Sequence, residues 1–233
     1  MTTFKSCIKP IIFSAVLCSN LVVAGQAEVQ KIEDATATVN VGQLQKMVNT
    51  LTGYDLALAQ YRLALSANVT GQTELANNTI EQAINTLEAL DKKSPDNVEI
   101  KALLAQVYGY KISIEPQKAA YYGPKAGEKL AQAQALAPDN PRVLLVQGIS
   151  KYTTPVMFGG DINAALSLFE RAAQAYASEQ NLTYQWGYAE AYTWQGLVNQ
   201  QLGNTEQAKQ NWQQALAVDA DYGWAKSLLG QAE

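Results

Sequence analysis

Apolar residues recur every three or four positions along most of the chain, and this spacing predicts amphipathic helices. In the segment 79–90, Ile80, Ile84 and Leu87 fall on one helical face. Proline-containing turns at 94–97 and 138–141 end one helix and begin the next, because proline cannot donate to a helical ladder whereas Asp and Asn cap free amides. We therefore predict an all-α chain with helices over 43–67, 79–90, 98–112, 125–136, 143–152, 161–177, 184–202, 205–218 and 224–231.

Small residues repeat along the chain with a long period. Alanines stand 43, 39 and 43 residues apart, each seven residues ahead of another small or apolar residue, at Ala83, Ala126, Ala165 and Ala208. A period of about forty residues is typical of stacked helical hairpins, in which small side chains let neighbouring helices approach.

Gly196, Ala208 and Ala215 are small residues in a helical-hairpin pattern, and Trp212 is a large residue between the last two. This arrangement resembles a tetratricopeptide repeat, which pairs two antiparallel helices over about 34 residues. The same template fits 144–172 and, less closely, 104–138. The resemblance implies a tetratricopeptide-like helical-hairpin solenoid over residues 43–233, with about four helix pairs, expanded inter-helix loops and a C-terminal capping helix.

The N-terminal segment has the layout of a secretory signal peptide. Lys5 and Lys9 precede an apolar run over 11–24, and small residues follow it. We predict a signal peptide over 1–27, a flexible segment over 28–42 and a periplasmic or secreted protein. Both cysteines lie within the first 18 residues, so the fold itself is expected to lack disulfides.

The segment 152–160 is the most unusual of the expanded loops. Its glycines permit positive φ angles, and its proline ends the preceding helix. Two interpretations are open: Met157 and Phe158 fold back to plug a gap between helices, or they join Tyr152 as an apolar lip over a groove.

In repeats of this kind the first helix of each pair lines the concave side, and the positions that match that lining form a mixed surface. It contains apolar and amide groups, one arginine and two acids. This mixture suits an extended peptide or a polar ligand, although a solvated groove without a partner is the alternative. With the loop included, the candidate binding residues are Glu99, Gln106, Tyr110, Arg142, Ile149, Tyr152, Met157, Phe158, Glu190 and Gln200.

The sequence contains few of the side chains that enzymes commonly use for catalysis. The chain contains no histidine and no cysteine beyond the N-terminal segment, so the usual general base, thiol nucleophile and zinc ligands are missing. We expect no enzyme activity, no cofactor and no metal. With 17 basic and 21 acidic residues the net charge is −4, which argues against nucleic-acid binding.

These observations favour a non-catalytic scaffold that holds another envelope protein, or a segment of one, in its concave groove. The alternative is a small-ligand-binding accessory subunit of a transport system, with the 152–160 loop as its lid. The Pro-x-x-Phe-Gly-Gly segment that begins at Pro155 and the Trp186-Gly187 step resemble those of exported repeat proteins. They are also similar to those of the repeat subunit associated with tripartite transporters.

Overall fold

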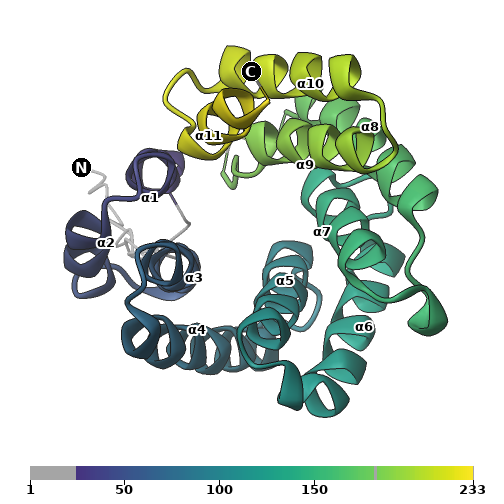
Figure 1. The fold of residues 1–233 in the computed structure, drawn as a ribbon. Coiled ribbons are helices and arrows are strands. Elements are labelled where there is room, and N and C mark those ends of the chain that lie inside the picture. The colour runs from purple at the N-terminus through teal and green to yellow at the C-terminus, as the bar shows by residue number, and fades with distance from the viewer. Residues whose placement is uncertain (1–24, 181–182, 233) are drawn as a thin grey trace, which may run out of the picture.

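The computed structural model describes residues 25–180 and 183–232, and helices are the only regular secondary structure in this part of the chain (Figure 1). It contains eleven α-helices and two short 3-10 turns, with no strand. The helices are α1 (Gln26–Ala37), α2 (Val41–Val48), α3 (Gly53–Val69), α4 (Thr73–Lys93), α5 (Val98–Ile114), α6 (Ala119–Leu136), α7 (Pro141–Thr153), α8 (Ile162–Ala177), α9 (Tyr188–Gln201), α10 (Thr205–Val218) and α11 (Gly223–Gln231). The 3-10 turns are η1 (Pro116–Lys118) and η2 (Val156–Phe158).

Four antiparallel hairpins, α3/α4, α5/α6, α7/α8 and α9/α10, stack in chain order, and this confirms the tetratricopeptide-like solenoid. The outer helices α4, α6, α8 and α10 bury one face only. The inner helices α3, α5, α7 and α9 are buried on most sides. Close helix crossings depend on glycine: a Cβ added at Gly148 would lie 2.5 Å from the Phe169 ring, and one at Gly196 would lie 2.1 Å from Trp212 Nε1.

The predicted turns act as helix caps. The Asn97 side chain accepts a hydrogen bond from the Ile100 amide at 3.1 Å, and Asn140 accepts from the amides of Arg142 and Val143. Side-chain caps of this kind satisfy amide groups that have no partner within the helix. The proline-containing turns therefore mark the starts of α5 and α7, as the sequence indicates.

The N-terminal part of the described chain corrects two predictions. Residues 28–42 are not a flexible segment, because they contain most of α1, whose Val29 and Ile32 are fully buried. The predicted helix over 43–67 is two helices, α2 and α3, separated by residues 49–52, and Gly53 at the start of α3 has a φ of +62°. Residues 1–24 of the predicted signal peptide lie outside the described residues.

Two stretches that the sequence leaves as connections between predicted helices, 68–78 and 113–124, are mostly helical. Helix α4 begins at Thr73, six residues before its predicted start, and α6 begins at Ala119 with Pro124 inside it. Helices at these positions extend the outer layer instead of building a rim of loops. The longest connections between α-helices are 154–161, which contains η2, and 178–187, of which residues 181–182 are not described.

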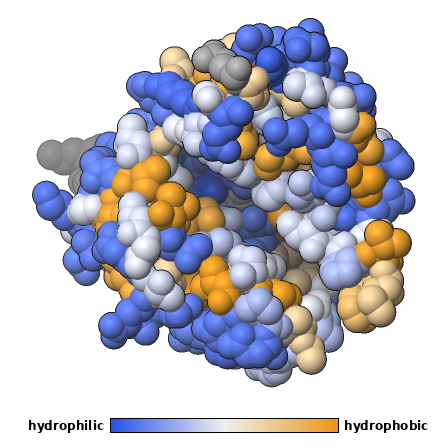
Figure 2. All heavy atoms as spheres, viewed as in Figure 1, coloured by the Kyte–Doolittle hydropathy of each residue, from blue (hydrophilic) through white to orange (hydrophobic). Residues whose placement is uncertain are grey.

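The stack closes into a ring, with α1 beside α11 (Figure 1). At this seam the two ends of the fold touch: a Cβ added to Gly223 would lie 2.6 Å from the carbonyl oxygen of Ala37. A tetratricopeptide array normally leaves its concave side open. Here the first helix and the last helix meet, so the inner helices surround a central hollow (Figure 2).

Candidate functional site

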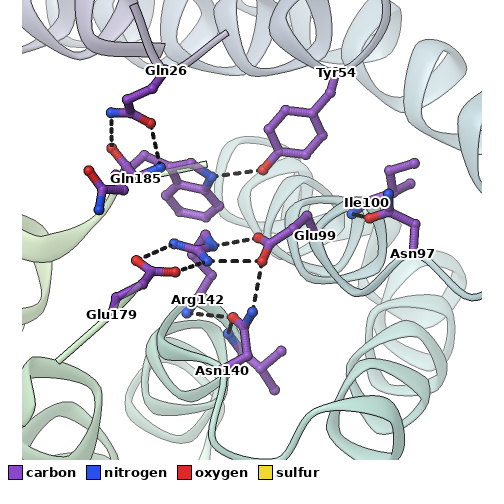
Figure 3. Close-up of polar contacts among 11 residues, drawn as sticks. Gln26, Tyr54, Asn97, Glu99, Ile100, Asn140, Arg142, Glu179 and Gln185 are labelled. Atoms are coloured by element: carbon purple, nitrogen blue, oxygen red, sulfur yellow. Dashed lines mark hydrogen bonds and ion pairs between the residues drawn. The ribbon is translucent and has the colours of Figure 1, made fainter. Parts of the chain in front are cut away.

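The first turns of the inner helices contain a buried cluster around Arg142, whose side chain is fully shielded from solvent. Its guanidinium donates from Nη2 to Glu99 Oε1 at 2.9 Å and from Nη1 to Glu179 Oε2 at 3.0 Å (Figure 3). Asn140 donates to the same Glu99 oxygen at 2.7 Å. The cluster therefore ties α5 and α7 to the connection between α8 and α9.

A second buried cluster surrounds Arg62 of α3. Its Nε donates to Glu33 of α1 at 2.9 Å, and its Nη2 donates to Glu190 of α9 at 3.1 Å. Burial alone would lower the pKa of Arg62, but the carboxylates of Glu33 and Glu190 outweigh it and hold that pKa well above its ordinary value. This guanidinium therefore joins the N-terminal helix to the last hairpin across the ring.

We call the connection between α8 and α9, residues 178–187 apart from the undescribed 181–182, the strap. Its Gln185 exchanges two hydrogen bonds with Gln26 of α1, and Trp186 Nε1 donates to the Tyr54 hydroxyl at 2.7 Å (Figure 3). Gly187 has a φ of +95° and leaves no room for a side chain against Tyr176. The strap covers the first turns of the inner helices and closes that end of the ring.

Three predicted binding residues are therefore not exposed in a groove. Glu99, Arg142 and Glu190 are buried and bonded within the chain. Their assignment assumed an open concave side, as in the resembled repeats. The strap and α1 instead supply the groups that these side chains contact, so we assign the three to stabilising the ring.

Further along the inner helices, Gln106 is also buried and donates to the Tyr61 hydroxyl at 2.8 Å. Tyr110 is half-buried, with its ring centroid 5.7 Å from that of Tyr61 in an edge-to-face contact. Burial raises the pKa of Tyr110 to about 12, so its phenol is neutral at physiological pH. Tyr110 remains a candidate contact residue, whereas Gln106 belongs to the interior.

The later turns of α7 and α9 and the start of α11 form an aromatic wall, which consists of Tyr152, Trp194 and Trp224. The ring centroids of Tyr152 and Trp194 are 5.4 Å apart, and those of Trp194 and Trp224 are 5.1 Å apart, both pairs edge-to-face. Trp194 also stacks on Phe169, and Trp224 is 36% exposed. Partly exposed aromatic rings on a rigid support are well suited to recognition.

Of the three wall residues, only Tyr152 is among the binding residues predicted from the sequence. Trp194 lies in α9, and Trp224 lies in α11, the predicted capping helix. Tyr152 stands four residues after Gly148, whereas Trp194 stands two residues before Gly196, so the repeat register does not relate them and gave no signal for Trp194. Of the two remaining candidates on the helices, Ile149 is buried in α7, and Gln200 is exposed on α9.

The loop over 154–160 is neither a plug nor a lip over the hollow. Met157 and Phe158 are 82% and 73% exposed, so they do not fill a gap between helices. The loop projects from the outer edge of the ring, away from its centre (Figure 1), and hydrophobic atoms gather at that edge in Figure 2. It therefore cannot act as a lid over the hollow in this conformation.

The cleft between the start of α7 and the end of α8 has a volume of about 450 Å³ and is open to solvent. Asp139, Arg171 and Glu179 are among its lining residues, and the 154–160 loop does not cover it. Among residues 25–180 and 183–232, no group of His, Cys, Asp and Glu is arranged to hold a metal ion. Within the same residues, no helix combines the length and apolar character needed to cross a membrane.

The comparisons with known proteins agree with the fold. No protein-family model matches the chain, and no curated protein matches it in sequence. Among solved structures, the chain is similar to the HusA haemophore from Porphyromonas gingivalis, with 21% identity over 76% of this chain and 91% of that one, and a TM-score of 0.53. It is also similar to TTC0263, a thermophilic TPR protein in Thermus thermophilus, with 14% identity, 89% and 95% coverage, and a TM-score of 0.53. These similarities establish a tetratricopeptide-like fold.

Proposed function

We propose that this protein is a non-catalytic scaffold of the cell envelope that binds a polypeptide segment at the aromatic wall. The observation that supports this is the position of Tyr152, Trp194 and Trp224, which join three helices in one continuous row of edge-to-face rings. Glu99, Arg142 and Glu190 are bonded within the chain, so we assign recognition to the aromatic side chains.

Binding at this wall would depend on burial of ring surface. Trp224 is the most exposed of the three and is held from behind by Trp194, so a partner gains apolar contact without ordering a flexible side chain. Interfaces commonly contain a few aromatic anchors whose loss costs more than about 2 kcal/mol. Gln200, which is exposed on α9, can exchange hydrogen bonds with a peptide backbone.

Site-specific photocrosslinking tests this assignment. A benzophenone amino acid replaces Trp224 in one version of the protein and Tyr121, which is 60% exposed on α6, in another. Both are expressed in the native host and irradiated in intact cells. The proposal expects a discrete crosslinked polypeptide from position 224 and none of that size from position 121. Equal labelling from both positions, or none from 224, would contradict it.

The second candidate function is capture of a small planar ligand on the same wall. The similar HusA structure is that of a haemophore, and the rings of Trp194 and Trp224 provide apolar surface on which a planar molecule could pack. Haemin is the probe: titration should quench tryptophan emission and shift the haem absorption band in the intact protein. A Trp224→Ala variant that binds haemin as tightly as the unchanged protein would exclude this site.

Export and transport remain proposals that rest on the N-terminal sequence and on local motifs. Cell fractionation and N-terminal sequencing of the native protein test export: cleavage close to residues 24–27 and recovery outside the cytoplasm are expected. A link to tripartite transporters would require co-purification with a substrate-binding protein of such a system.

A further inference from the structure

The tip of the α7–α8 connection exposes three consecutive apolar side chains, although the described chain buries most of its large apolar residues. Val156, Met157 and Phe158 are 83%, 82% and 73% exposed. They form the turn η2 at the point where the loop extends furthest from the ring (Figure 1). Contiguous apolar surface of this kind marks an interaction site more often than an accident of folding.

The backbone holds this tip in one conformation. Lys151 Nζ donates to the Gly159 carbonyl at 2.9 Å, and the Asp161 amide donates to the Lys151 carbonyl at 2.9 Å, so the base of the loop is clamped. Gly159 has a φ of +96°, and a Cβ on Gly160 would lie 1.7 Å from the Thr154 carbonyl oxygen. Only glycines permit this path, and the apolar side chains are displayed without an ordering cost at the moment of binding.

The tip also satisfies much of its own backbone. The Phe158 amide donates to the Pro155 carbonyl at 2.8 Å, the Gly159 amide to Val156 at 3.0 Å, and the Gly160 amide to Pro155 at 3.2 Å. Pro155 itself has no N–H group to satisfy. Backbone groups that are already bonded lower the cost of moving a loop from water into an apolar phase.

The charges around the tip differ from those of the whole chain. Residues 150–160 contain one lysine and no carboxylate, whereas the complete sequence has a net charge of −4. The nearest acid in sequence, Asp161, accepts hydrogen bonds from the Asn163 and Ala164 amides and caps α8. The loop can therefore approach an anionic surface without bringing an uncapped carboxylate of its own close to it.

From these features we propose that the 154–160 loop inserts into the surface of a lipid bilayer, with Met157 and Phe158 at the acyl boundary and Lys151 towards the headgroups. A protein partner would need a matching cavity, and three side chains on a projection offer much less than the roughly 800 Å² that each side of a stable protein interface buries. A fluid bilayer closes around a convex projection. Apolar tips beside basic residues bind bilayer surfaces in this way.

Vesicle flotation tests the proposal with the full chain. The Met157→Ser, Phe158→Ser double variant is compared with the unchanged protein and with Val69→Ser, which removes an apolar side chain that is 74% exposed at the end of α3. The vesicles are phosphatidylcholine with or without phosphatidylglycerol. The first 24 residues are common to all variants, so any binding they cause is a constant background.

We expect the double variant to reduce the fraction of protein that floats with the vesicles, after subtraction of the background, at least about tenfold. Val69→Ser should leave that fraction unchanged. Binding should be stronger with phosphatidylglycerol and weaken as salt is added. Circular dichroism melts should coincide, because all three side chains lie in solvent. Equal flotation of all variants, or no flotation beyond background with either lipid, would overturn the proposal.

A second measurement places the tip within the bilayer. In a Phe158→Trp variant, brominated lipids should quench the added emission, measured as the difference from the unchanged protein. A matched Val69→Trp variant should show no such difference. Quenching of neither variant, or of both to the same extent, would show that the tip stays in water.

Discussion

Removal of the Arg142 guanidinium is the sharpest test of how the ring is held. This side chain is fully buried and contacts Glu99 and Glu179, whose side chains are 7% and 6% exposed. An Arg142→Met change keeps the apolar part of the side chain and leaves two carboxylates close together without their cation. Loss of one partner from a buried ion cluster costs about 3–5 kcal/mol. For a chain of this size, that lowers the melting temperature by about 6–20 °C.

The assay is urea unfolding followed by far-ultraviolet circular dichroism, with the free energy taken from the midpoint and slope. Arg142→Lys is the first control. It keeps the positive charge but replaces the planar guanidinium, which donates to both carboxylates, with a single ammonium group, so we expect an intermediate loss of unfolding free energy. The second control neutralises the whole cluster through Glu99→Gln, Arg142→Met and Glu179→Gln. It should recover much of the lost stability, because no uncompensated charge remains.

A loss of less than about 1 kcal/mol for Arg142→Met, the level of an exposed ion pair, would contradict a stabilising role for the buried charge. A neutralised cluster no more stable than the single variant would also contradict it, because the loss would then come from packing and not from charge.

Three further changes test the packing, the buried charge and the loop. Gly196→Ala should lower the free energy of unfolding by about 1–3 kcal/mol, because the new methyl group meets the Trp212 ring. Gly127→Ala in α6, where a Cβ meets nothing within 4 Å, should leave the free energy of unfolding unchanged or raise it by up to about 1 kcal/mol. Equal effects of the two substitutions would contradict the close contact between Gly196 and the Trp212 ring. Burial raises the pKa of Glu33 in the folded state. The protonated carboxyl therefore stabilises the fold at pH values below the pKa of Glu33 in the unfolded chain, and this stability is lost as the pH rises through its pKa in the folded protein. The unfolding free energy of the unchanged protein, relative to Glu33→Gln, should therefore fall as the pH rises above 4.5, the ordinary pKa of a glutamate, and a difference that rises would refute the sign. Gly160→Ala should displace the loop without changing its apolar side chains and so reduce vesicle binding while the melting curve moves little; binding that persists would show that the clamp is dispensable.

Local patterns predicted the hairpins because short-range physics determines them. Trp212 and Gly196 meet across one helix crossing, and Asn97 and Asn140 cap the helices that follow them. Such contacts repeat with the period of the solenoid, so they are visible in a single sequence.

Ring closure could not be predicted in the same way. Arg62 contacts Glu190, 128 residues further along the chain, and Trp186 contacts Tyr54, 132 residues away. Neither pair belongs to the repeat, so no periodic pattern indicates them. The register of the repeats therefore placed Glu99, Arg142 and Glu190 on an open surface that the strap covers. The sequence marked the loop that contains Met157 and Phe158 as unusual, but nothing in it indicated that these side chains point outward.

Small-angle X-ray scattering can show whether the solenoid is a closed ring in solution. A compact fold of this length has a radius of gyration of about 17 Å, and the closed ring should give a value close to that with a single-peaked distance distribution. An extended distribution with a long tail, as an open superhelix would give, would contradict the closure on which the site assignment depends.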